Sequence, residues 1–188
     1  MSPERDLLPP MPAHVASEFL LWLAYREAQG RGTYTVDDNP VSVSLQDDVE
    51  LKSPEEDAPS VVLRGLGSSE HPELLASLRA GRMLYRAKLR VGCAEDREYR
   101  LTLTGPTLEW SGVKLPRIVK TGDLGEGLYE ELHRVVRAIF AQYAARRVDE
   151  DRWTQEGNSM RAWLGETFAR VFAFDPTTGQ GRLFGGEA

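Results

Sequence analysis

Two clusters of acidic residues are the first candidates for chemistry in this sequence. Residues 37–38 and 47–50 carry carboxylates, the oxygen ligands that divalent cations prefer. Asp48 and Glu50, however, occupy the polar positions of a segment in which apolar and polar residues alternate. Such alternation is typical of a strand with one solvated face. We therefore favour a solvated strand face over a metal site.

The histidines and the single cysteine also lack the neighbours that catalysis requires. His133 lies beside Glu130 and Arg134 in a helical segment and is interpreted as a solvated surface histidine. Cys93 lies near a hairpin turn without a histidine nearby in sequence, so it is interpreted as a plain thiol. No glycine-rich phosphate loop and no Gly-x-Ser-x-Gly motif occurs. We predict a protein without catalytic residues, metal or cofactor.

A run of basic residues on one predicted strand is the strongest functional signal. Residues 82–91 alternate, with Met83, Tyr85, Ala87, Leu89 and Val91 predicted on one face and the basic residues on the other. Alternate strand positions recur about every 6.6 Å, which resembles the separation of phosphates along a nucleic-acid strand. The predicted DNA-binding residues are Arg82, Arg86, Lys88, Arg90 and, on the next strand, Arg100, extended by Lys114 and Arg117, with Arg64 and Lys120 as further candidates.

This basic face has two interpretations. It could be an ordinary exposed sheet face whose cations are balanced by Glu95, Asp96 and Glu98. It could instead bind the backbone of double-stranded DNA without reading bases. Base stacking of the single-strand kind is not indicated, because Tyr85 and Tyr99 are predicted to point away from the basic face.

The C-terminal segment carries a second candidate motif. Gln180, Leu183 and Phe184 resemble the pentapeptide by which bacterial polymerases and repair proteins dock on the replicative sliding clamp. An exposed Leu-Phe pair in a glycine-rich tail is typical of a docking peptide. In the alternative interpretation, Phe184 folds back onto the body of the protein.

Hydrophobic periodicity predicts the elements that position these residues. Helices are expected over residues 13–29, 72–80, 128–147 and 149–172, and strands over 41–51, 60–64, 83–91 and 98–104, with a short strand pair over 107–115. This order predicts an α+β fold: an antiparallel sheet with an N-terminal helix and C-terminal helices packed on one face. Residues 1–12 are expected to form an extended lead-in, 13–174 a single domain and 175–188 a flexible tail.

Length and composition limit the class of protein. A chain of 188 residues fits one domain, and one cysteine rules out an internal disulfide. The longest apolar run has seven residues, far short of a membrane span, and the start of the chain lacks a secretory signal. We expect a cytoplasmic protein at the nucleoid. The net charge is −6, but residues 61–120 hold 11 basic and 6 acidic side chains. An acidic protein with one basic face is therefore expected.

Several segments resemble the C-terminal half of the recombination-associated protein RdgC family. The resemblance covers about residues 15–147, and its anchors are the segments 18–23, 45–51, 80–91, 98–104 and 114–116. It implies nonspecific binding of double-stranded DNA, an action on the RecA recombinase and a ring-shaped dimer. This chain has no counterpart of the family's N-terminal half, and its segment after Arg147 has none in the family. An open dimer, or a clamp that needs a partner, would follow.

The leading hypothesis is therefore a non-enzymatic, sequence-nonspecific DNA-binding protein that acts in recombination or replication. Its partners would be double-stranded DNA, the sliding clamp and a second copy of the chain. The rival hypothesis is a protein-interaction module that does not contact nucleic acid. Its basic face would meet an acidic partner or water, and Trp153 and Trp163 would mark an association surface.

Overall fold

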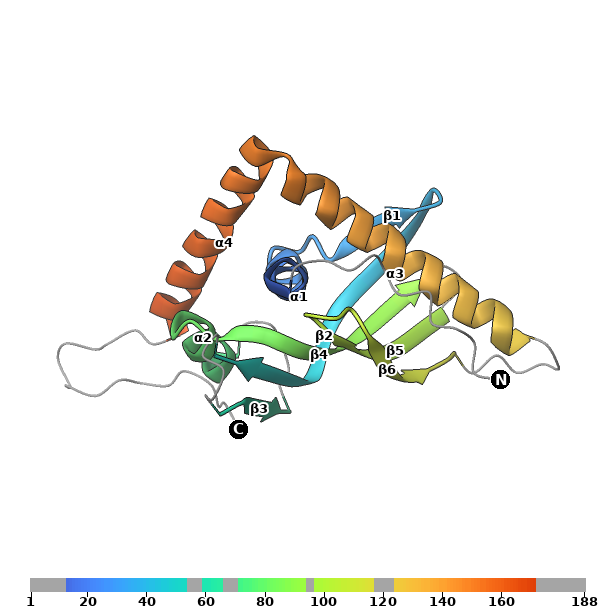
Figure 1. Cartoon of the computed structure of the whole chain (residues 1–188), viewed down its shortest axis with the longest axis horizontal. Coiled ribbons are helices and arrows are strands. Elements are labelled where there is room, and N and C mark those ends of the chain that lie inside the picture. The colour runs from blue at the N-terminus through green and yellow to red at the C-terminus, as the bar shows by residue number, and fades with distance from the viewer. Residues whose placement is uncertain (1–12, 54–58, 66–70, 94–96, 117–123, 172–188) are drawn as a thin grey trace.

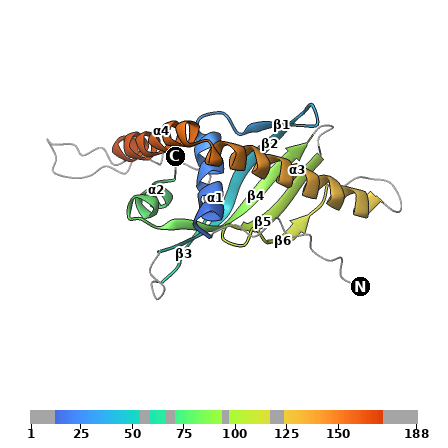
Figure 2. The ribbon, with the colours of Figure 1, turned by 45° about the horizontal axis from the view of Figure 1, so that its top comes forward.

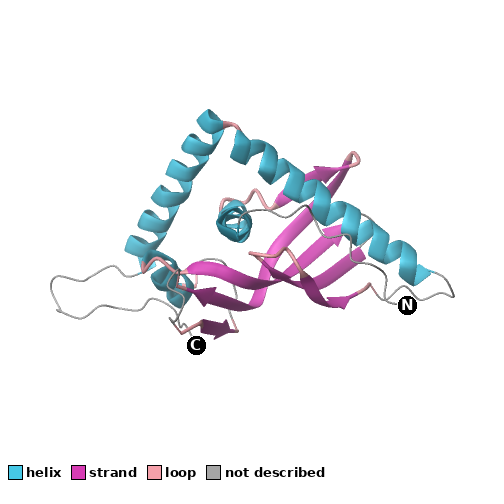
Figure 3. Ribbon diagram, in the orientation of Figure 1, coloured by secondary structure: helices cyan, strands magenta, loops and turns pink. Residues whose placement is uncertain are grey.

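A six-stranded antiparallel sheet and four helices make up the part of the chain that the computed structural model describes, residues 13–53, 59–65, 71–93, 97–116 and 124–171 (Figure 1, Figure 3). The helices are α1 (Ala13–Ala28), α2 (Pro72–Arg79), α3 (Leu124–Val148) and α4 (Glu150–Val171). The strands are β1 (Thr33–Val36), β2 (Asn39–Lys52), β3 (Val61–Arg64), β4 (Met83–Cys93), β5 (Arg97–Thr104) and β6 (Trp110–Lys114). The predicted α+β class and antiparallel sheet are confirmed.

The long strand β2 organises the sheet. The strand order is β1-β2-β4-β5-β6, and β3 also pairs with β2. On one side, β2 pairs with β4 over most of its length. On its other side it pairs with β1 near its start and with β3 near its end. The interval between β1 and β3 leaves part of this edge of β2 without a strand partner.

That open interval is filled by α1 and the loop that follows it. The backbone N–H of Val43 donates to the carbonyl oxygen of Gly32 at 2.8 Å. The backbone N–H of Leu45 donates to Oε2 of Glu27 at 3.0 Å. A Cβ atom at residue 32 would lie 2.9 Å from the Val43 oxygen, so this close approach requires glycine. The donors of β2 are thus satisfied without another strand.

The inner face of the sheet, the side covered by α1 and α3, carries the hydrophobic core (Figure 2). Aromatic rings of both helices meet above the sheet, with Phe19 5.1 Å from Phe140 and 5.2 Å from Tyr143 between ring centroids. These helices follow the predicted apolar periodicity, because each turns one continuous stripe toward the strands. The predicted placement of helices on one face is confirmed.

Helix α4 packs against the end of this core through two tryptophans, Trp153 and Trp163. Trp163 is 4% exposed and packs 5.7 Å from Tyr25, and Trp153 meets Tyr143 edge-on. Carboxylate Glu156 of α4 accepts a hydrogen bond from the indole of Trp22 at 2.9 Å. Both tryptophans therefore pack α4 against the core. The prediction that they mark an association surface is wrong for the buried Trp163, whereas Trp153 is half-buried.

Two further elements differ from expectation. Strand β1 was not predicted; it forms a hairpin with β2 through Asp37 and Asp38, whose φ angles are 49° and 63°. Aspartate tolerates this left-handed conformation better than most residues, and two such residues in succession suit a tight hairpin turn. Residues 107–115 contribute one strand, β6, rather than the expected pair. The predicted lead-in 1–12 and the tail 175–188 lie outside the described residues. No described helix combines the length and low charge that a membrane span requires.

Candidate nucleic-acid interface

The outer face of the sheet, opposite α1 and α3, carries most of the predicted basic residues. Along β4, Ala87, Leu89 and Val91 are at most 3% exposed and face the core. Arg86 and Arg90, at the alternate positions, are exposed. By strand register, the outer face holds Ser44, Asp48, Glu50 and Lys52 of β2, Val62 and Arg64 of β3, Arg86, Lys88 and Arg90 of β4, Glu98, Arg100 and Thr102 of β5, and Ser111 and Lys114 of β6.

A β-bulge at Tyr85 changes which residues at the start of β4 face outward. Leu51 of β2 pairs with Leu84 whereas its neighbour Glu50 pairs with Arg86, so Tyr85 has no partner on β2. Leu84 is 1% exposed and Met83 is 38% exposed. Because Tyr85 is an extra residue in β4, each side chain before it faces the side of the sheet opposite to the one that regular alternation predicts. The prediction that Met83 and Tyr85 face the core is wrong.

The same bulge separates Arg82 from the other predicted binding residues. Arg82 precedes β4. Counted in steps of two along the strand, it belongs with the buried Leu84 and not with the exposed Arg86, because the bulge lies between them. Its guanidinium donates to the carbonyl oxygen of Pro59 at 2.9 Å. Its side chain thus connects the start of β4 to the chain before β3. Arg82 is not part of the row of cations that was predicted for one strand face.

Tyr85 also brings an aromatic ring to the outer face. The ammonium of Lys52 lies 3.4 Å from the centroid of the Tyr85 ring, a cation–π contact. Tyr99, in contrast, is buried and donates to Glu131. The expectation that no aromatic residue lies on the basic side holds for Tyr99 and fails for Tyr85. Because Tyr85 is half-buried and already stacked with Lys52, its ring is a poor platform for a base.

Three basic residues form a row across the sheet. Arg90 of β4 is directly opposite Arg100 of β5, and Arg100 is directly opposite Lys114 of β6. We call these three residues the cationic row. Neighbouring strands are about 4.8 Å apart, so the row spans about 10 Å between its outer Cα atoms. The sequence predicted all three residues but not their alignment, which depends on the pairing of distant strands.

A glycine bulge in β6 brings Lys114 into this row. Thr102 pairs with Ser111 and Arg100 with Lys114, so two steps along β5 correspond to three along β6. The extra residue is accommodated at Gly112, whose φ is 61°. Glycine adopts this left-handed conformation without the steric cost that a Cβ atom imposes. In an unbulged strand, Ser111 and Lys114 would face opposite sides of the sheet.

Glu98 is the internal counter-ion of the row. Its two carboxylate oxygens contact Arg90 at 2.7 Å and Arg100 at 2.8 Å. The hydrogen bond from Arg100, aided by the charge of Arg90, holds the pKa of the Glu98 carboxyl below its usual range. Glu98 therefore stays ionised in this position and neutralises part of the positive charge of the face.

The remaining outer-face cations differ in whether they have partners. Lys88 forms an ion pair with Asp48 at 3.3 Å. Within the described residues, Arg64, Arg86 and Lys114 make no ion pair or side-chain hydrogen bond. These three side chains are available to an external anion. The predicted residue Arg117 and the docking residues Gln180, Leu183 and Phe184 lie outside the described residues, as does Lys120.

His133 and Cys93, which were first considered for catalysis, are both half-buried. The ring of His133 lies 5.4 Å from that of Trp110. The prediction of a solvated surface histidine is therefore wrong, because the helix turns His133 toward β6. Burial, with the negative charge of Glu131, raises the pKa of the Cys93 thiol and makes the thiolate nucleophile less available. No group of three or more His, Cys, Asp or Glu residues within the described ranges is arranged to hold a metal ion.

The described part of the outer face offers guanidinium, ammonium and hydroxyl donors from five strands, β2 to β6. Such donors suit phosphate oxygens, which all sequences share. Comparison with known proteins adds no family: no family model, curated protein or solved structure matches this chain.

Proposed function

We propose that this protein is a non-enzymatic protein that binds the backbone of double-stranded DNA through the outer face of its sheet, without sequence preference. The binding residues are Arg86, Lys88, Arg90, Arg100 and Lys114. This residue set contains the predicted basic face without Arg82, whose guanidinium is occupied by the backbone.

The cationic row is the observation that carries this proposal. Arg90, Arg100 and Lys114 lie side by side in register, although directly opposed like charges destabilise a sheet. A stability role would favour neutral or alternating charges at these positions. A polyanion that lies across the strands would stabilise the row, because it brings phosphates to all three cations.

Arg86 and the ion-paired Lys88 extend the surface along β4. Positions 86, 88 and 90 follow one another at about 6.6 Å. The row across the sheet and the line along β4 meet at Arg90 and together form an L-shaped positive surface. Nearby hydroxyls of Ser111 and Thr102 can donate to phosphate oxygens. These donors match phosphate oxygens, which all sequences share, so we expect no sequence preference.

The biological part of the proposal rests on the resemblance to the RdgC family. That resemblance supports a role in DNA recombination or replication, a location at the nucleoid and assembly of two copies of the chain. Docking on the sliding clamp through Gln180, Leu183 and Phe184 is a separate part of the proposal and rests on the tail sequence alone.

The first experiment measures binding of a fluorescently labelled duplex of about 30 base pairs by anisotropy at several salt concentrations. We expect log affinity to fall linearly with log salt at a slope of about −4, because each of four or five phosphate contacts contributes about −0.9. The variant Arg86→Glu/Lys88→Glu/Arg90→Glu should not bind detectably. The milder Arg86→Gln/Lys88→Gln/Arg90→Gln variant should retain weak binding with a shallower slope.

A matched control carries the same change of charge on the helices. Arg137, Arg152 and Arg161 are exposed on α3 and α4, and their triple glutamate variant should bind DNA nearly as well as the wild type. Circular dichroism would verify that every variant is folded. Equal loss of affinity in both triple variants would indicate a general effect of net charge and would discard the proposed face.

A protein-interaction module is the second candidate, favoured by the ion pairs already present. Glu98 and Asp48 occupy Arg90, Arg100 and Lys88, as expected of a face that is solvated or that meets an acidic protein. A wild-type protein that fails to bind duplex at low salt would support this candidate. Capture of partners with the wild type but not with the triple glutamate variant would then locate its interface.

A further inference from the structure

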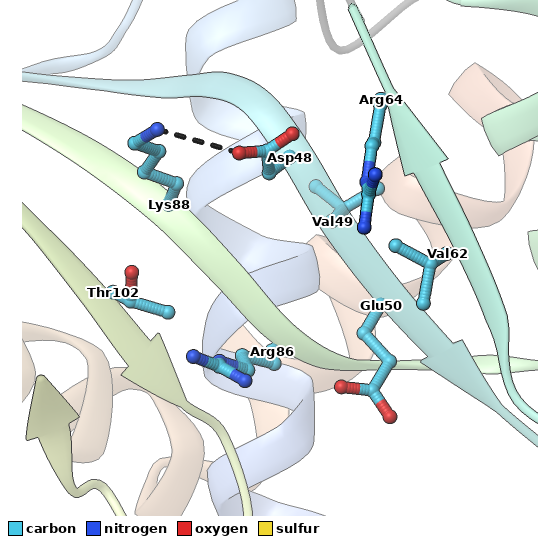
Figure 4. A pocket seen from close by; sticks show the side chains of 8 residues that line it. All are labelled: Asp48, Val49, Glu50, Val62, Arg64, Arg86, Lys88 and Thr102. Carbon is cyan, nitrogen blue, oxygen red and sulfur yellow. Dashed lines mark hydrogen bonds and ion pairs between the residues drawn. The ribbon is translucent and has the colours of Figure 1, made fainter. Parts of the chain in front are cut away.

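A hollow lies beside the cationic residues of β4, where the sheet is most irregular (Figure 4). Between Leu45 and Val49, β2 has two more residues than β4 between their partners Leu89 and Ala87. The extra residues bend β2 and leave a cavity of about 330 Å³ on the outer face. This open hollow has room for a phosphate group.

Five ionisable side chains line the hollow, and their pairing leaves two guanidinium groups without a counter-ion. The lining contains Asp48, Glu50, Arg64, Arg86 and Lys88. Asp48 is paired with Lys88 at 3.3 Å, and Glu50 with the neighbouring Lys52 at 3.7 Å. Neither Arg64 nor Arg86 has an ion pair or side-chain hydrogen bond among the described residues. The lining of the hollow thus has three basic and two acidic side chains, and the two cations without a counter-ion are the exposed Arg64 and Arg86.

The two arginines approach the hollow from opposite sides of β2. Arg64 of β3 is opposite Asp48, and Arg86 of β4 is opposite Glu50. In Figure 4, Arg64 lies beside Val49 and Val62, and the guanidinium of Arg86 is directed toward Thr102. Each guanidinium can form two parallel hydrogen bonds to an oxyanion, so the pair suits an anion with several oxygens and more than one charge.

We infer that the hollow binds a phosphate monoester, the terminal phosphate of a DNA strand whose duplex lies on the outer face. A monoester carries a charge of about −1.5 to −2 and three acceptor oxygens, whereas an internal phosphodiester carries one charge. This inference rests on the proposed function, because the duplex brings its strand end to the hollow. Arg90, Lys88 and Arg86 lead along β4 to this position.

The two carboxylates of the hollow also repel phosphate, but each is paired with a lysine. Asp48 contacts Lys88 at 3.3 Å and Glu50 contacts Lys52 at 3.7 Å, which reduces this repulsion. A monoester carries more negative charge than a diester, so it gains more from the unpaired Arg64 and Arg86. The outer face would therefore favour duplex ends or nicks that carry a phosphate over uninterrupted DNA.

The test compares one duplex sequence with three kinds of end: 5′-phosphate, 3′-phosphate and hydroxyl only. We expect the wild type to bind one of the phosphorylated duplexes about tenfold more tightly than the hydroxyl-ended duplex, since one added charge-assisted contact is worth at least 1.4 kcal/mol. Arg64→Gln should abolish that preference and leave the affinity for the hydroxyl-ended duplex unchanged. Arg137→Gln on α3 removes the same charge elsewhere and should retain the preference.

The possible outcomes separate this inference from the proposed function. Equal affinity for all three duplexes would overturn the terminal-phosphate site and leave backbone binding intact. A preference that persists in Arg64→Gln would also overturn it, because the extra charge of the ligand alone would then explain the effect. No binding of any duplex would overturn both proposals.

Free ligands identify the source of the phosphate. A nucleoside 5′-monophosphate, inorganic phosphate and a phosphoserine peptide are each titrated as competitors of the phosphorylated duplex. Weak competition by the mononucleotide and by inorganic phosphate, lost in Arg64→Gln, would support the site. A phosphoserine peptide that binds more tightly than the phosphorylated duplex would overturn the assignment to a DNA end.

Discussion

At the residue scale, Glu98 determines how much positive charge the cationic row presents. Its carboxylate contacts two of the three cations of the row, Arg90 and Arg100, and Lys114 is left unpaired. A phosphate that approaches the row must therefore compete with an anion that belongs to the protein. Glu98 relieves repulsion between the two arginines, and under the proposed function it would limit the affinity for DNA.

Replacement Glu98→Gln tests this role. The variant keeps the shape of the side chain but releases Arg90 and Arg100, so we expect affinity for duplex to rise several-fold at moderate salt. The salt slope should become steeper by about one to two phosphate contacts, each worth about −0.9. Anisotropy titrations across salt concentrations measure both quantities.

The control for this prediction is Glu130→Gln. Glu130 is exposed on α3, and its replacement changes the net charge equally. An equal rise of affinity in both variants would assign the effect to net charge rather than to Glu98. Unchanged affinity and slope in Glu98→Gln would contradict a role of the row in binding.

Glu27 is a second residue whose ionisation matters, here for stability. Its carboxylate accepts the Leu45 N–H in the interval between β1 and β3. Burial raises its pKa above the usual 4.5, and the hydrogen bond from Leu45 opposes this rise only in part. The folded state therefore holds the Glu27 proton more tightly than the unfolded state does.

The sign of the pH effect follows from linkage. The pKa of Glu27 is higher in the folded state than in the unfolded state. Its contribution to the free energy of unfolding is therefore complete below pH 4.5 and is lost as pH rises through the folded pKa. We expect the free energy of unfolding of the wild type to fall over this window relative to Glu27→Gln, which keeps an acceptor but does not ionise. Urea denaturation of both proteins at a series of pH values measures the difference.

The control variant Glu27→Ala removes the acceptor. Relative to Glu27→Gln, it should lose about 1–2 kcal/mol at every pH, because neither variant ionises at residue 27 and the Leu45 N–H of the alanine variant has no partner. A difference between wild type and Glu27→Gln that does not vary with pH would disprove the linkage.

At the element scale, irregular strand pairing builds the outer face. The bulge at Tyr85 sets Arg82 apart and exposes Met83, the extra residues of β2 form the hollow, and the bulge at Gly112 aligns Lys114 with Arg100. Bulges alter the direction of side chains without altering the order of strands. The candidate site thus depends on departures from regular β structure.

Replacement Gly112→Ala tests one of these bulges. Its φ of 61° is costly for a residue with a Cβ atom, so we expect a loss of about 1–2 kcal/mol in the free energy of unfolding. Space is not the limit, because the added Cβ would lie 3.7 Å from Oγ1 of Thr102. If the bulge relaxes, DNA affinity should fall as far as in Lys114→Gln. Thermal unfolding and anisotropy measure the two effects.

Gly127→Ala in α3 is the matched control. The φ of Gly127 is not positive, and no atom lies within 4 Å of the position that a Cβ would take. Alanine at this position should therefore stabilise the helix by about 0.5–1 kcal/mol. A Gly112→Ala variant as stable as the wild type would mean that the bulge is not under this constraint.

At the scale of the whole molecule, charge is separated between the faces. The chain has a net charge of −6, whereas the outer face defined by strand register holds seven basic and three acidic side chains. A local field of this kind steers an anionic ligand to one face and keeps it from the rest of the surface. Under the proposed function, this separation would place DNA on the outer face.

The tail gives a prediction that is independent of this face. Leu183→Ala/Phe184→Ala should leave duplex affinity and salt slope unchanged, because these residues are far along the chain from β4 and β5. The same variant should lose association with a purified bacterial sliding clamp, since the apolar anchor of the docking peptide is removed. Biolayer interferometry with immobilised clamp measures this. Retained clamp binding in the double variant would reject the tail hypothesis.

Much of the fold was predictable from the sequence because periodicity is a local property. The stripes of α1 and α3 and the alternation along β2, β4 and β5 can each be recognised within one segment. They are sufficient to predict an antiparallel sheet with helices on one face. Strand β1 was missed because four residues carry little periodic signal, although the Asp37-Asp38 turn beside it was a usable indication.

The sequence could predict which residue types form the candidate site, but not how these residues are arranged. Clustered basic residues in 82–100 indicated a positive face, but the exclusion of Arg82 and the outward position of Tyr85 depend on one unpaired residue in β4. Likewise, the packing of Trp163 depends on where α4 meets α1, and that of Trp153 on where α4 meets α3. A bulge or a helix contact is decided by the balance of packing over the whole core, which no single segment contains.

The sequence by itself therefore determined the class of fold, the helix-covered face and the concentration of positive charge in the middle of the chain. Only the tertiary structure decided that Arg90, Arg100 and Lys114 align, that Glu98 neutralises two of them and that Arg64 and Arg86 remain unpaired in a hollow. The physical reason is that side-chain periodicity is set within a strand, whereas register and ion pairing are set between strands that are distant in sequence.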